Sequence, residues 1–261
     1  MEYLLCIDIG NTNVVAALLK GEAVTAEIRI ASSPLQMQDE YRIAISGMLS
    51  RTGLKASALC GSVISSVVPR LTTPFTEVCR QIIGREPLIV DPFLPLNLKI
   101  RYDDPSEVGA DRICNAAGAL RLYAPPLIVV DMGTATTFDI VSGDREYLGG
   151  LIMPGLETAG HDLFERAARL PEVRFAFPEK LIGKNTRESL QAGLMWGTIA
   201  QIDGLIDKVA KEWKVKDFDV IATGGLSEIL APHSRYIRHV NKSLTLIGMR
   251  DIWEQLREKP L

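Results

Sequence analysis

The chain has 261 residues, of which 47% are hydrophobic and 23% are charged, a globular composition that excludes an intrinsically disordered chain. A net charge of -3 without basic runs argues against nucleic acid or an anionic membrane as a partner. No stretch approaches the roughly 20 apolar residues that cross a bilayer, and the N-terminus lacks the features of a secretion signal, so we expect a cytoplasmic protein.

The first half of the chain begins with three apolar, β-branched segments that predict strands, and then alternates between helical and strand patterns. The predicted strands are residues 3–10, 14–20, 23–31, 59–65 and 88–91. The predicted helices are residues 36–51 and 69–83. A further helix over 109–123, GADRICNAAGALRLY, joins this half to the next without a Gly/Ser linker.

The second half repeats this order of elements. Its predicted strands are residues 127–133, 135–142, 145–153 and 218–225. Helices are expected near 155–169 and 186–211, with a short helix after the last strand. This alternation is typical of a mixed sheet covered by helices. We therefore predict an α/β fold of two lobes, residues 1–115 and 116–261, each a mixed sheet flanked by helices, with a ligand cleft between the lobes.

Two similar polar loops follow predicted strands. DIGNTN (8–13) follows the apolar run YLLCI, and DMGTAT (131–136) follows LIVV. A strand that ends in Asp-x-Gly holds a carboxylate on a rigid support, and the glycine lets backbone N–H groups approach a phosphate closely. The Asn and Thr side chains supply neutral hydrogen-bond groups, while the carboxylates need a cation between themselves and a phosphate. The pair of loops therefore predicts a site for a nucleotide–metal complex.

An ordinary structural explanation of these loops also exists, because Asp, Gly, Asn and Thr are common turn residues. The second copy, after a matching strand, favours the functional interpretation. TGG (223–225) follows a third strand and is a candidate to lie against the same nucleotide. The sequence contains neither GxxxxGK[ST] nor GxGxxG, so a P-loop or a Rossmann site has no motif to support it.

These motifs resemble those of a known superfamily and of one family within it. The loops are similar to those of the actin, sugar kinase and Hsp70 superfamily of ATP-binding folds, and more closely the chain resembles type III pantothenate kinases nearly from end to end. The matching segments are DIGNTN (8–13), YDDPSEVGADR (102–112), DMGTATTFD (131–139), GGLIMPG (149–155), GKNTRESLQAG (183–193) and ATGG (222–225). The resemblance implies two ribonuclease H-like lobes, each with a mixed five-stranded sheet flanked by helices, and an inter-lobe nucleotide cleft. It also implies ATP-dependent phosphorylation of pantothenate to 4′-phosphopantothenate, the first step of coenzyme A synthesis.

The resemblance further implies the nucleotide and metal sites. The ATP-binding residues would be Asp8, Ile9, Gly10, Asn11, Thr12, Asn13, Val14, Val15 and Thr134. Asp8 would act through Mg²⁺, or a similar divalent cation, bound to ATP. Asp131 matches the family position that binds a monovalent cation, K⁺ or NH₄⁺.

Asp111 matches the family's proposed catalytic base. A positioned carboxylate that takes the proton from a primary alcohol accelerates its reaction by roughly 10²–10⁴-fold. However, GADR also opens a predicted helix, where an Asp in the first turn interacts favourably with the helix dipole. Position alone therefore leaves a structural role as the alternative, and the resemblance favours the catalytic one.

The substrate-binding positions that the resemblance implies are Tyr102, Gly109, Ala110, Asp111, Arg112 and Thr186. Arg112 can bind the pantothenate carboxylate in bidentate fashion, although a surface ion pair is the common alternative for Arg. Thr186 lies in NTRE (185–188), which fits a helix capping box, so a structural position at a helix start is its alternative. The family instead places this Thr against the pantothenate of the neighbouring subunit, which implies a homodimer with the substrate site near the interface.

Two other functions stay open from the sequence. The first is another kinase of the superfamily that acts on a sugar or small acid. Sugar kinases of this fold are usually longer, or carry a Cys-rich zinc motif that this sequence lacks. The second is a nucleotide-dependent regulatory protein without catalysis, against which the Asp111–Arg112 pair argues.

Overall fold

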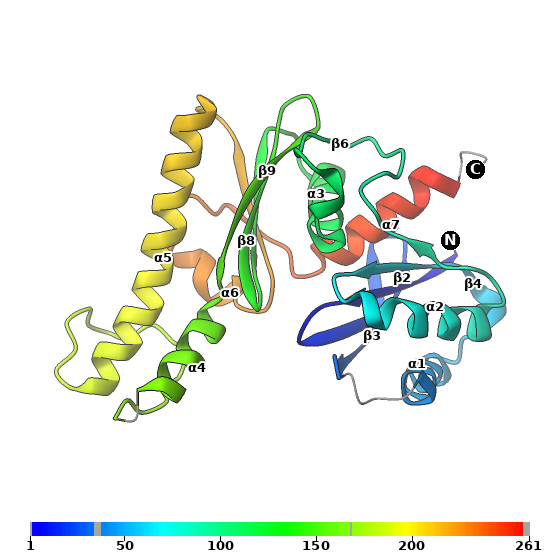
Figure 1. Cartoon of the computed structure of the whole chain (residues 1–261), viewed down its shortest axis with the longest axis horizontal. Helices are drawn as coiled ribbons and strands as arrows, with labels where there is room; N and C mark the ends of the chain where they lie inside the picture. The colour runs from blue at the N-terminus through cyan, green and yellow to red at the C-terminus, as the bar shows by residue number, and fades with distance from the viewer. Residues whose placement is uncertain (1, 34–37, 168, 258–261) are drawn as a thin grey trace. The chain divides into compact units, whose positions relative to one another are not determined.

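The computed structural model describes residues 2–33, 38–167 and 169–257 of the chain (Figure 1). The chain divides into two compact units: unit 1 comprises Met1–Tyr123, Arg145–Leu148 and Ser243–Leu261, and unit 2 comprises Ala124–Asp144 and Gly149–Lys242. Each unit is assembled from segments that are distant in the sequence. Within the described ranges, no helix combines the length and the apolar character that crossing a bilayer requires.

Unit 1 is built on a mixed sheet of order β3-β2-β1-β4-β5. Its strands are β1 (Tyr3–Ile9), β2 (Asn13–Lys20), β3 (Ala23–Ala31), β4 (Leu59–Ser66) and β5 (Leu88–Ile89). The first three strands form an antiparallel meander, whereas β4 runs parallel to β1 and β5 runs parallel to β4. The carboxyl ends of β1 and β4 therefore meet at one edge of the sheet, where ligands of α/β folds usually bind.

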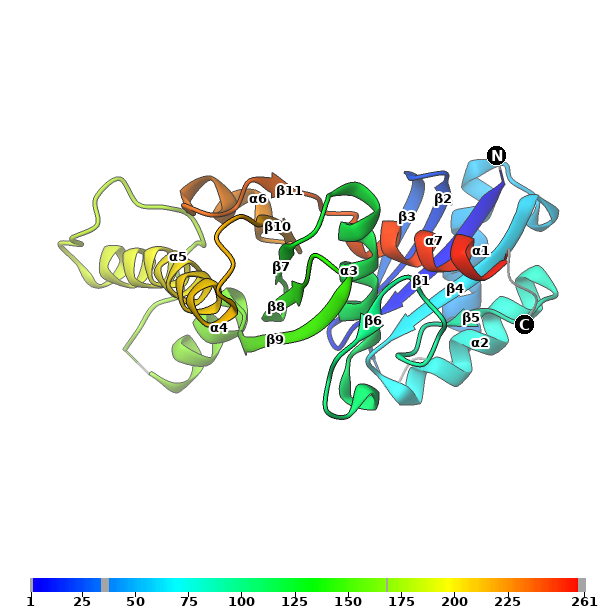
Figure 2. The ribbon, with the colours of Figure 1, turned by 90° about the horizontal axis from the view of Figure 1, so that it is seen from above.

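Helices cover both faces of this sheet (Figures 1 and 2). α1 (Gln38–Thr52) and α2 (Pro69–Ile83) lie on one face, where Leu5 and Ile7 of β1 share a buried cluster with Tyr41 and Phe75. α3 (Ala110–Leu122) and α7 (Leu244–Arg257) lie on the other face. Because strand side chains alternate between faces, β1 is buried on both sides, which explains its continuous apolar run. Two 3₁₀ turns, η1 (Ala56–Ala58) and η2 (Pro105–Glu107), connect these elements.

α3 and α7 cross in direct backbone contact. A side chain at Gly118 of α3 would overlap the backbone of α7, and a side chain at Gly248 of α7 would overlap the Cys114 carbonyl oxygen of α3. At the same crossing the Thr245 hydroxyl donates to Asn115 Oδ1 at 2.7 Å. Glycine at both positions permits an approach that any side chain would prevent. This contact fixes the position of α3, the helix whose first turn carries the predicted catalytic base.

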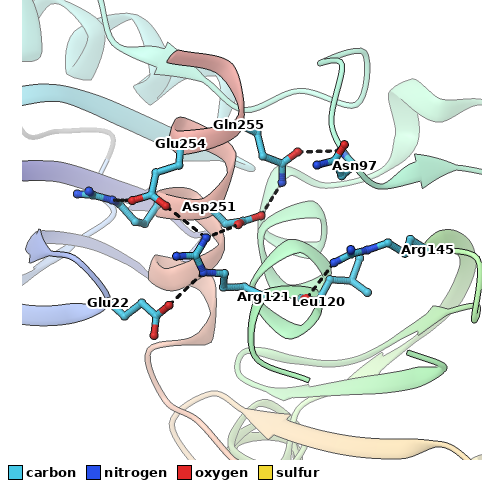
Figure 3. A network of polar contacts seen from close by, with 9 residues as sticks. Glu22, Asn97, Leu120, Arg121, Arg145, Asp251, Glu254 and Gln255 are labelled. Carbon is cyan, nitrogen blue, oxygen red and sulfur yellow. Dashed lines mark hydrogen bonds and ion pairs between the residues drawn. The ribbon is translucent and has the colours of Figure 1, made fainter. Parts of the chain in front are cut away.

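Arg121, near the C-terminal end of α3, ties this helix to α7 a second time (Figure 3). Its guanidinium lies 3.0 Å from Glu22 in the β2–β3 turn, and 3.3 Å from both Asp251 and Glu254 of α7. Gln255 donates to the Asp251 carboxylate at 2.6 Å and extends the network. The Arg121 side chain is 40% exposed, and ion pairs of exposed side chains contribute about 0–1 kcal/mol each and weaken with salt. The network therefore adds to the glycine contact without replacing it.

A second mixed sheet, of order β11-β10-β7-β8-β9-β6, contains the strands of unit 2. Its strands are β6 (Lys99–Ile100), β7 (Leu127–Met132), β8 (Ala135–Val141), β9 (Glu146–Pro154), β10 (Asp219–Thr223) and β11 (His239–Val240). β7 and β8 are antiparallel, whereas β10 runs parallel to β7 and to β11. β6 and the first residues of β9 pair in parallel and belong to unit 1.

The long helix α5 (Thr186–Trp213) buries one face of the unit 2 strands. Its residues at helical spacing, Met195, Ile199, Ile202 and Ile206, share one cluster with side chains of β7, β8 and β10. The remaining helical elements of the unit are α4 (Leu156–Arg166), α6 (Ser227–Leu230) and the 3₁₀ turn η3 (Ala231–His233). Each contributes at least one residue to the same cluster.

The α/β class with two mixed sheets is confirmed. The second sheet has six strands rather than five, because the two-residue strands β6 and β11 join its two edges beside the four strands predicted from the sequence. α7 is absent from the predicted helices. Gly248 and Arg250 interrupt its apolar positions in the sequence, and both residues are buried where α7 packs in the folded chain. Residues 36, 37 and 168, at the ends of two predicted helices, lie outside the described residues. A lobe boundary at 115/116 stays a prediction; it falls within α3, whose two ends belong to unit 1.

We expect Gly248→Ala to destabilise the fold by about 1–3 kcal/mol, because the added methyl group overlaps the α3 backbone. Gly47→Ala in α1 is the matched control: nothing lies within 4 Å of its added methyl group, and alanine is preferred to glycine in a helix by roughly 0.5–1 kcal/mol. Urea unfolding of both variants measures the difference. A Gly248→Ala chain as stable as the unmodified chain would contradict the close crossing of α3 and α7.

Candidate active site

Residues 8–13 and 131–136 are called the first and second Asp-Gly loops. The first Asp-Gly loop contains the turn of the β1–β2 hairpin. Gly10, Asn11 and Thr12 form the turn, which the Gly10 amide closes by donating to the Asn13 carbonyl at 3.0 Å. Ser32, which follows β3, holds the turn by donating its hydroxyl to the Gly10 carbonyl at 2.6 Å. Asn11 and Thr12 are exposed, so their side chains can reach a ligand.

Other residues of the predicted ATP loop contribute differently. The side chains of Ile9 and Val14 are fully buried in the core, so only their backbone atoms can face a ligand. Asp8 and Val15 form a backbone pair across the hairpin, and both are partly buried. The apolar side chains of the loop thus anchor the turn in the core. The polar side chains and the backbone N–H groups are the parts of the loop that can contact a ligand.

The end of β4 brings this loop and the start of α3 together within unit 1. Ser65 of β4 is fully buried; its hydroxyl donates to Asp8 Oδ1 at 2.9 Å and also contacts the thiol of Cys114 on α3. Just after β4, Val67 Cγ1 would lie 3.4 Å from a Cβ at Gly109. No sequence motif points to Ser65. Its role follows from the parallel register that sets it beside Asp8.

The predicted substrate residues lie in the segment that leads from β6 into α3. Within it, Asp104 caps η2 by accepting hydrogen bonds from the Ser106 amide at 2.9 Å and from the Ser106 hydroxyl at 2.6 Å. Gly109 is the N-cap residue of α3, and a Cβ there would lie only 2.6 Å from Asp111 Oδ1. Glycine at this position therefore allows the Asp111 carboxylate to fold back over the helix start.

The surroundings of Asp111 shift its pKa. Burial raises its pKa above the ordinary value of 3.8, while a hydrogen bond from the Arg112 amide at 2.8 Å and the charge of Arg112 offset part of this effect. A raised pKa makes the carboxylate a better proton acceptor. A residue that served only the helix dipole would have its pKa lowered by that interaction, so the dipole alone does not account for this environment.

Arg112 is buried, with only 6% of its surface exposed, so a surface ion pair does not describe it. Its guanidinium carbon lies 5.7 Å from the centre of the Tyr147 ring. The Tyr147 ring in turn lies 6.3 Å from the ring of Tyr102. Tyr147, at the start of β9, therefore contacts two predicted substrate residues. Nothing in its local sequence pattern pointed to this, because β9 reads as an ordinary strand.

The second Asp-Gly loop, in unit 2, is the turn of the β7–β8 hairpin. The Gly133 amide donates to the Ala135 carbonyl at 3.0 Å, and Thr134 stands exposed at the tip. Asp131, like Asp8, lies near the end of a strand, two residues before the glycine, and is partly buried. The repeat seen in the sequence is therefore a repeated hairpin.

The start of α4 holds the tip of this second loop. The Gly155 amide and the Thr158 hydroxyl both donate to the Thr134 carbonyl, at 3.1 and 2.7 Å. A Cβ at Gly155 would overlap the carbonyl oxygens of Gly133 and Thr134. Thr134, the predicted ATP contact of this loop, thus has a fixed backbone.

The third glycine loop packs on the second Asp-Gly loop. Gly224 has a φ of +89°, and a Cβ there would lie 2.6 Å from both Asp131 Oδ1 and the Met132 carbonyl. Ser227 is fully buried and holds the loop by donating its hydroxyl to the Gly224 carbonyl at 2.7 Å. Gly224 therefore limits where the Asp131 carboxylate can lie, a function that the TGG pattern alone did not reveal.

Thr186 is the exposed first residue of α5, and Asn185 caps this helix as predicted, although the Glu188 side chain binds the amide of Lys184 rather than that of Asn185, which a capping box would require. Asn185 Oδ1 accepts from the Glu188 amide at 3.0 Å, and Glu188 Oε2 accepts from the Lys184 amide at 2.7 Å. The same helix start lines a groove of about 570 Å³, together with Leu163 of α4 and other residues. Thr186 itself makes no contribution to the cap, so its side chain is available for another contact.

Both Asp-Gly loops suit a nucleotide–metal complex. Each presents an exposed turn with backbone N–H groups and a glycine that leaves room for close approach. Each also holds a partly buried carboxylate, the ligand that hard cations prefer.

Comparison with known proteins identifies the family. The sequence profile described as type III pantothenate kinase matches residues 4–208. The chain belongs to the type III pantothenate kinase family. It is therefore a kinase, and kinases of this family use ATP with a divalent cation. The profile covers both Asp-Gly loops, the 102–112 segment and the start of α5.

Individual relatives and structures agree with this. The type III pantothenate kinase of Moorella thermoacetica is 43% identical over 252 residues, which cover 97% of this chain and 99% of that protein. The type III pantothenate kinase of Geobacillus thermodenitrificans is 40% identical over 256 residues, covering 98% and 99%. The crystal structure of the ROK hexokinase of Thermus thermophilus superposes with a TM-score of 0.53 at 12% identity, covering 98% of this chain and 100% of that one. At this identity, the hexokinase shows a shared sugar kinase-like fold and nothing more.

The raised pKa of Asp111 predicts how stability depends on pH. The folded chain binds this proton more tightly than the unfolded chain, so stability falls as pH rises from the ordinary pKa of 3.8 through the raised value. We therefore expect Asp111→Asn to unfold at a higher temperature than the unmodified chain at pH 7. The gain should shrink toward zero below pH 3.8, where both side chains are neutral.

Melting temperatures of the two chains across this pH range provide the measurement. Asp103→Asn, which changes an exposed carboxylate of the same segment, is the control and should alter the profile little. A loss of stability in Asp111→Asn at pH 7 would show that the ionised carboxylate stabilises the fold, contrary to the expectation.

Proposed function

We propose that this chain transfers the γ-phosphoryl group of ATP to pantothenate, giving 4′-phosphopantothenate in the first step of coenzyme A synthesis. The observation that carries the proposal is the start of α3, where a partly buried carboxylate of raised pKa is followed by a buried arginine. Membership of the family supports the same function. So does Ser65, which contacts both Asp8 of the first Asp-Gly loop and Cys114 of α3. We place the reaction in the cytoplasm, because ATP is the phosphoryl donor.

In this proposal Asp111 acts as the general base. Its carboxylate accepts the proton of the pantothenate hydroxyl while that oxygen attacks the γ-phosphorus and ADP leaves. General base catalysis of this kind contributes roughly 10²–10⁴-fold. Positioning of the substrates and stabilisation of charge supply the rest of the rate acceleration, as in other phosphoryl transfers.

The nucleotide and its cations are assigned to the two Asp-Gly loops. Residues 8–15 and Thr134 bind ATP; Asp8 acts through the divalent cation, and Asp131 holds K⁺ or NH₄⁺. Bound cations would neutralise phosphate charge that the carboxylates alone would repel. The tight turns at Gly10 and Gly133 and the contact of Gly224 with Asp131 support these assignments, because they leave backbone and carboxylate groups accessible and fixed.

Pantothenate is assigned to the segment before α3 and to its first turn. Arg112 would bind the carboxylate of pantothenate, with Tyr102, Gly109 and Ala110 forming the rest of this side of the site. A buried guanidinium binds a carboxylate more strongly than an exposed one, since water competes less. The burial of Arg112 supports its assignment on this ground.

We further propose a homodimer in which Thr186 of one subunit contacts the pantothenate of the other, so that the substrate site is near the interface. The exposed position of Thr186 beside a groove is compatible with such a contact. We also retain residues 1–115 and 116–261 as the two ribonuclease H-like halves of the repeat.

The function is tested by incubating purified protein with ATP, Mg²⁺, K⁺ and either pantothenate or a panel of sugars and small acids, with products identified by mass. Phosphorylated pantothenate is expected, and Asp111→Asn should lower kcat by roughly 10²-fold or more. Asp103→Asn should keep normal turnover. Phosphorylation of a sugar in preference to pantothenate would establish the first alternative. Nucleotide binding without any phosphorylated acceptor would establish the second.

We expect activity to rise strongly when Na⁺ is replaced by K⁺ or NH₄⁺, because Asp131 would hold the larger, weakly hydrated ion beside the phosphates. Asp131→Ala should remove this dependence, and Gly224→Ala should weaken it, since the added methyl group displaces the Asp131 carboxylate. Asp144→Ala, at an exposed carboxylate of the same unit, is the control. Initial rates in matched chloride buffers measure the effect, and equal rates in Na⁺ and K⁺ would refute the monovalent cation site.

Subunit mixing tests the shared substrate site. Asp111→Asn and Thr186→Arg should each be inactive as pure dimers. After exchange, roughly half of the dimers are mixed, and each mixed dimer has one site with both residues intact, so about a quarter of the sites should recover. Thr186→Ser, which keeps the hydroxyl, should remain active. Absence of recovery despite proven exchange of two inactive parents would assign both residues to the same chain's site.

A further inference from the structure

Tyr147 is a fully buried tyrosine at the start of β9 that the proposed function does not use. Its backbone is fixed by β6, because it is paired in register with Ile100 and its carbonyl accepts from the Arg101 amide at 2.9 Å. Beside it, Glu146 pairs with Arg101, whose Nε lies 2.8 Å from Glu146 Oε1. The ring of Tyr147 is therefore held on a strand whose pairing leads directly into Tyr102.

The ring of Tyr147 faces the proposed carboxylate-binding residue. The guanidinium carbon of Arg112 lies 5.7 Å from the ring centre, within the range of a cation–π contact. The Tyr102 ring lies 6.3 Å from the Tyr147 ring at an angle of 48°. A single buried side chain thus contacts both residues that the proposed function assigns to pantothenate.

The surroundings of a buried arginine must stabilise its charge and fix the orientation of its side chain. An aromatic face attracts the guanidinium cation without competing for the N–H groups that lie in the guanidinium plane and would bind a carboxylate. A ring that is itself fixed also restricts the rotamers of a long side chain, so less freedom is lost when the substrate binds. Geometry of this kind orients a binding group before the ligand arrives.

We propose that Tyr147 is a positioning residue that holds Arg112 in the orientation that binds the substrate carboxylate. The proposal rests on the proposed function and adds a specificity determinant to it. Tyr147 touches neither reacting atom, and it acts through Arg112. Its effect should therefore appear in the discrimination between acidic and neutral substrates rather than in the chemical step.

The test compares pantothenate with an analogue in which a neutral amide replaces the carboxylate. For each variant, the discrimination ratio is kcat/KM for pantothenate divided by kcat/KM for the amide. Tyr147→Leu should raise KM for pantothenate, leave kcat for both substrates nearly unchanged and lower the ratio by about tenfold or more, corresponding to loss of one well-oriented charged contact. Tyr147→Phe keeps the ring face and should keep the ratio.

Tyr41→Leu is the matched control for structural damage. Tyr41 is also a buried tyrosine of unit 1, packed on Phe75 in the cluster on the α1 and α2 side of the sheet. Its loss should lower the melting temperature at least as much as Tyr147→Leu does, while leaving the discrimination ratio unchanged. A ratio that falls equally in both variants would overturn the proposal, because the effect would then follow stability.

Arg112→Met separates failure of this proposal from failure of the proposed function. If the discrimination ratio persists in Arg112→Met, Arg112 does not bind the carboxylate, and the assignment under the proposed function is wrong. If the ratio collapses in Arg112→Met but persists in Tyr147→Leu, only the positioning role of Tyr147 is wrong. The double variant should lose no more discrimination than Arg112→Met alone, since the two residues act as one unit.

Discussion

The backbone contact between α3 and α7 is the constraint on which the substrate side of this protein depends. Two glycines, Gly118 and Gly248, bring the helices together where any side chain would keep them apart. The first turn of α3 carries Asp111 and Arg112, so the packing of a helix from the far end of the chain determines where the proposed base and carboxylate ligand stand. Ion pairs of the partly exposed Arg121 add to this contact but are weak and salt-dependent.

The nucleotide loops are built on a different principle, a hairpin turn that is used twice. In both copies an Asp near the strand end precedes a glycine by two residues, and the glycine amide closes the turn. Each copy is then held from outside by a different partner: Ser32 and Ser65 for the first, and Gly224 with the start of α4 for the second. Because the turn itself is the same in both copies, the difference between the environments of the two carboxylates comes from these supporting residues.

Much of this could be predicted from the sequence, and what could not has a physical reason. Strands and helices with long apolar patterns, such as β3 and α2, follow from local periodicity. The short strands β6 and β11 and the glycine-interrupted helix α7 do not, because they form through contacts with distant segments. Candidate site residues were found through motifs, whereas Ser65 and Tyr147 were not. Their roles arise from strand register and ring packing, which leave no mark on neighbouring residues.

We propose that each substrate has its own set of residues, the segment 102–112 for pantothenate and the two Asp-Gly loops for ATP. Amide hydrogen exchange, measured with a non-hydrolysable ATP analogue and Mg²⁺ and then with pantothenate added, tests it directly. The nucleotide should slow exchange in residues 8–15 and 131–136, and adding pantothenate should slow exchange in residues 102–112. Unchanged exchange in residues 102–112, at pantothenate concentrations that saturate turnover, would contradict this assignment of the pantothenate site.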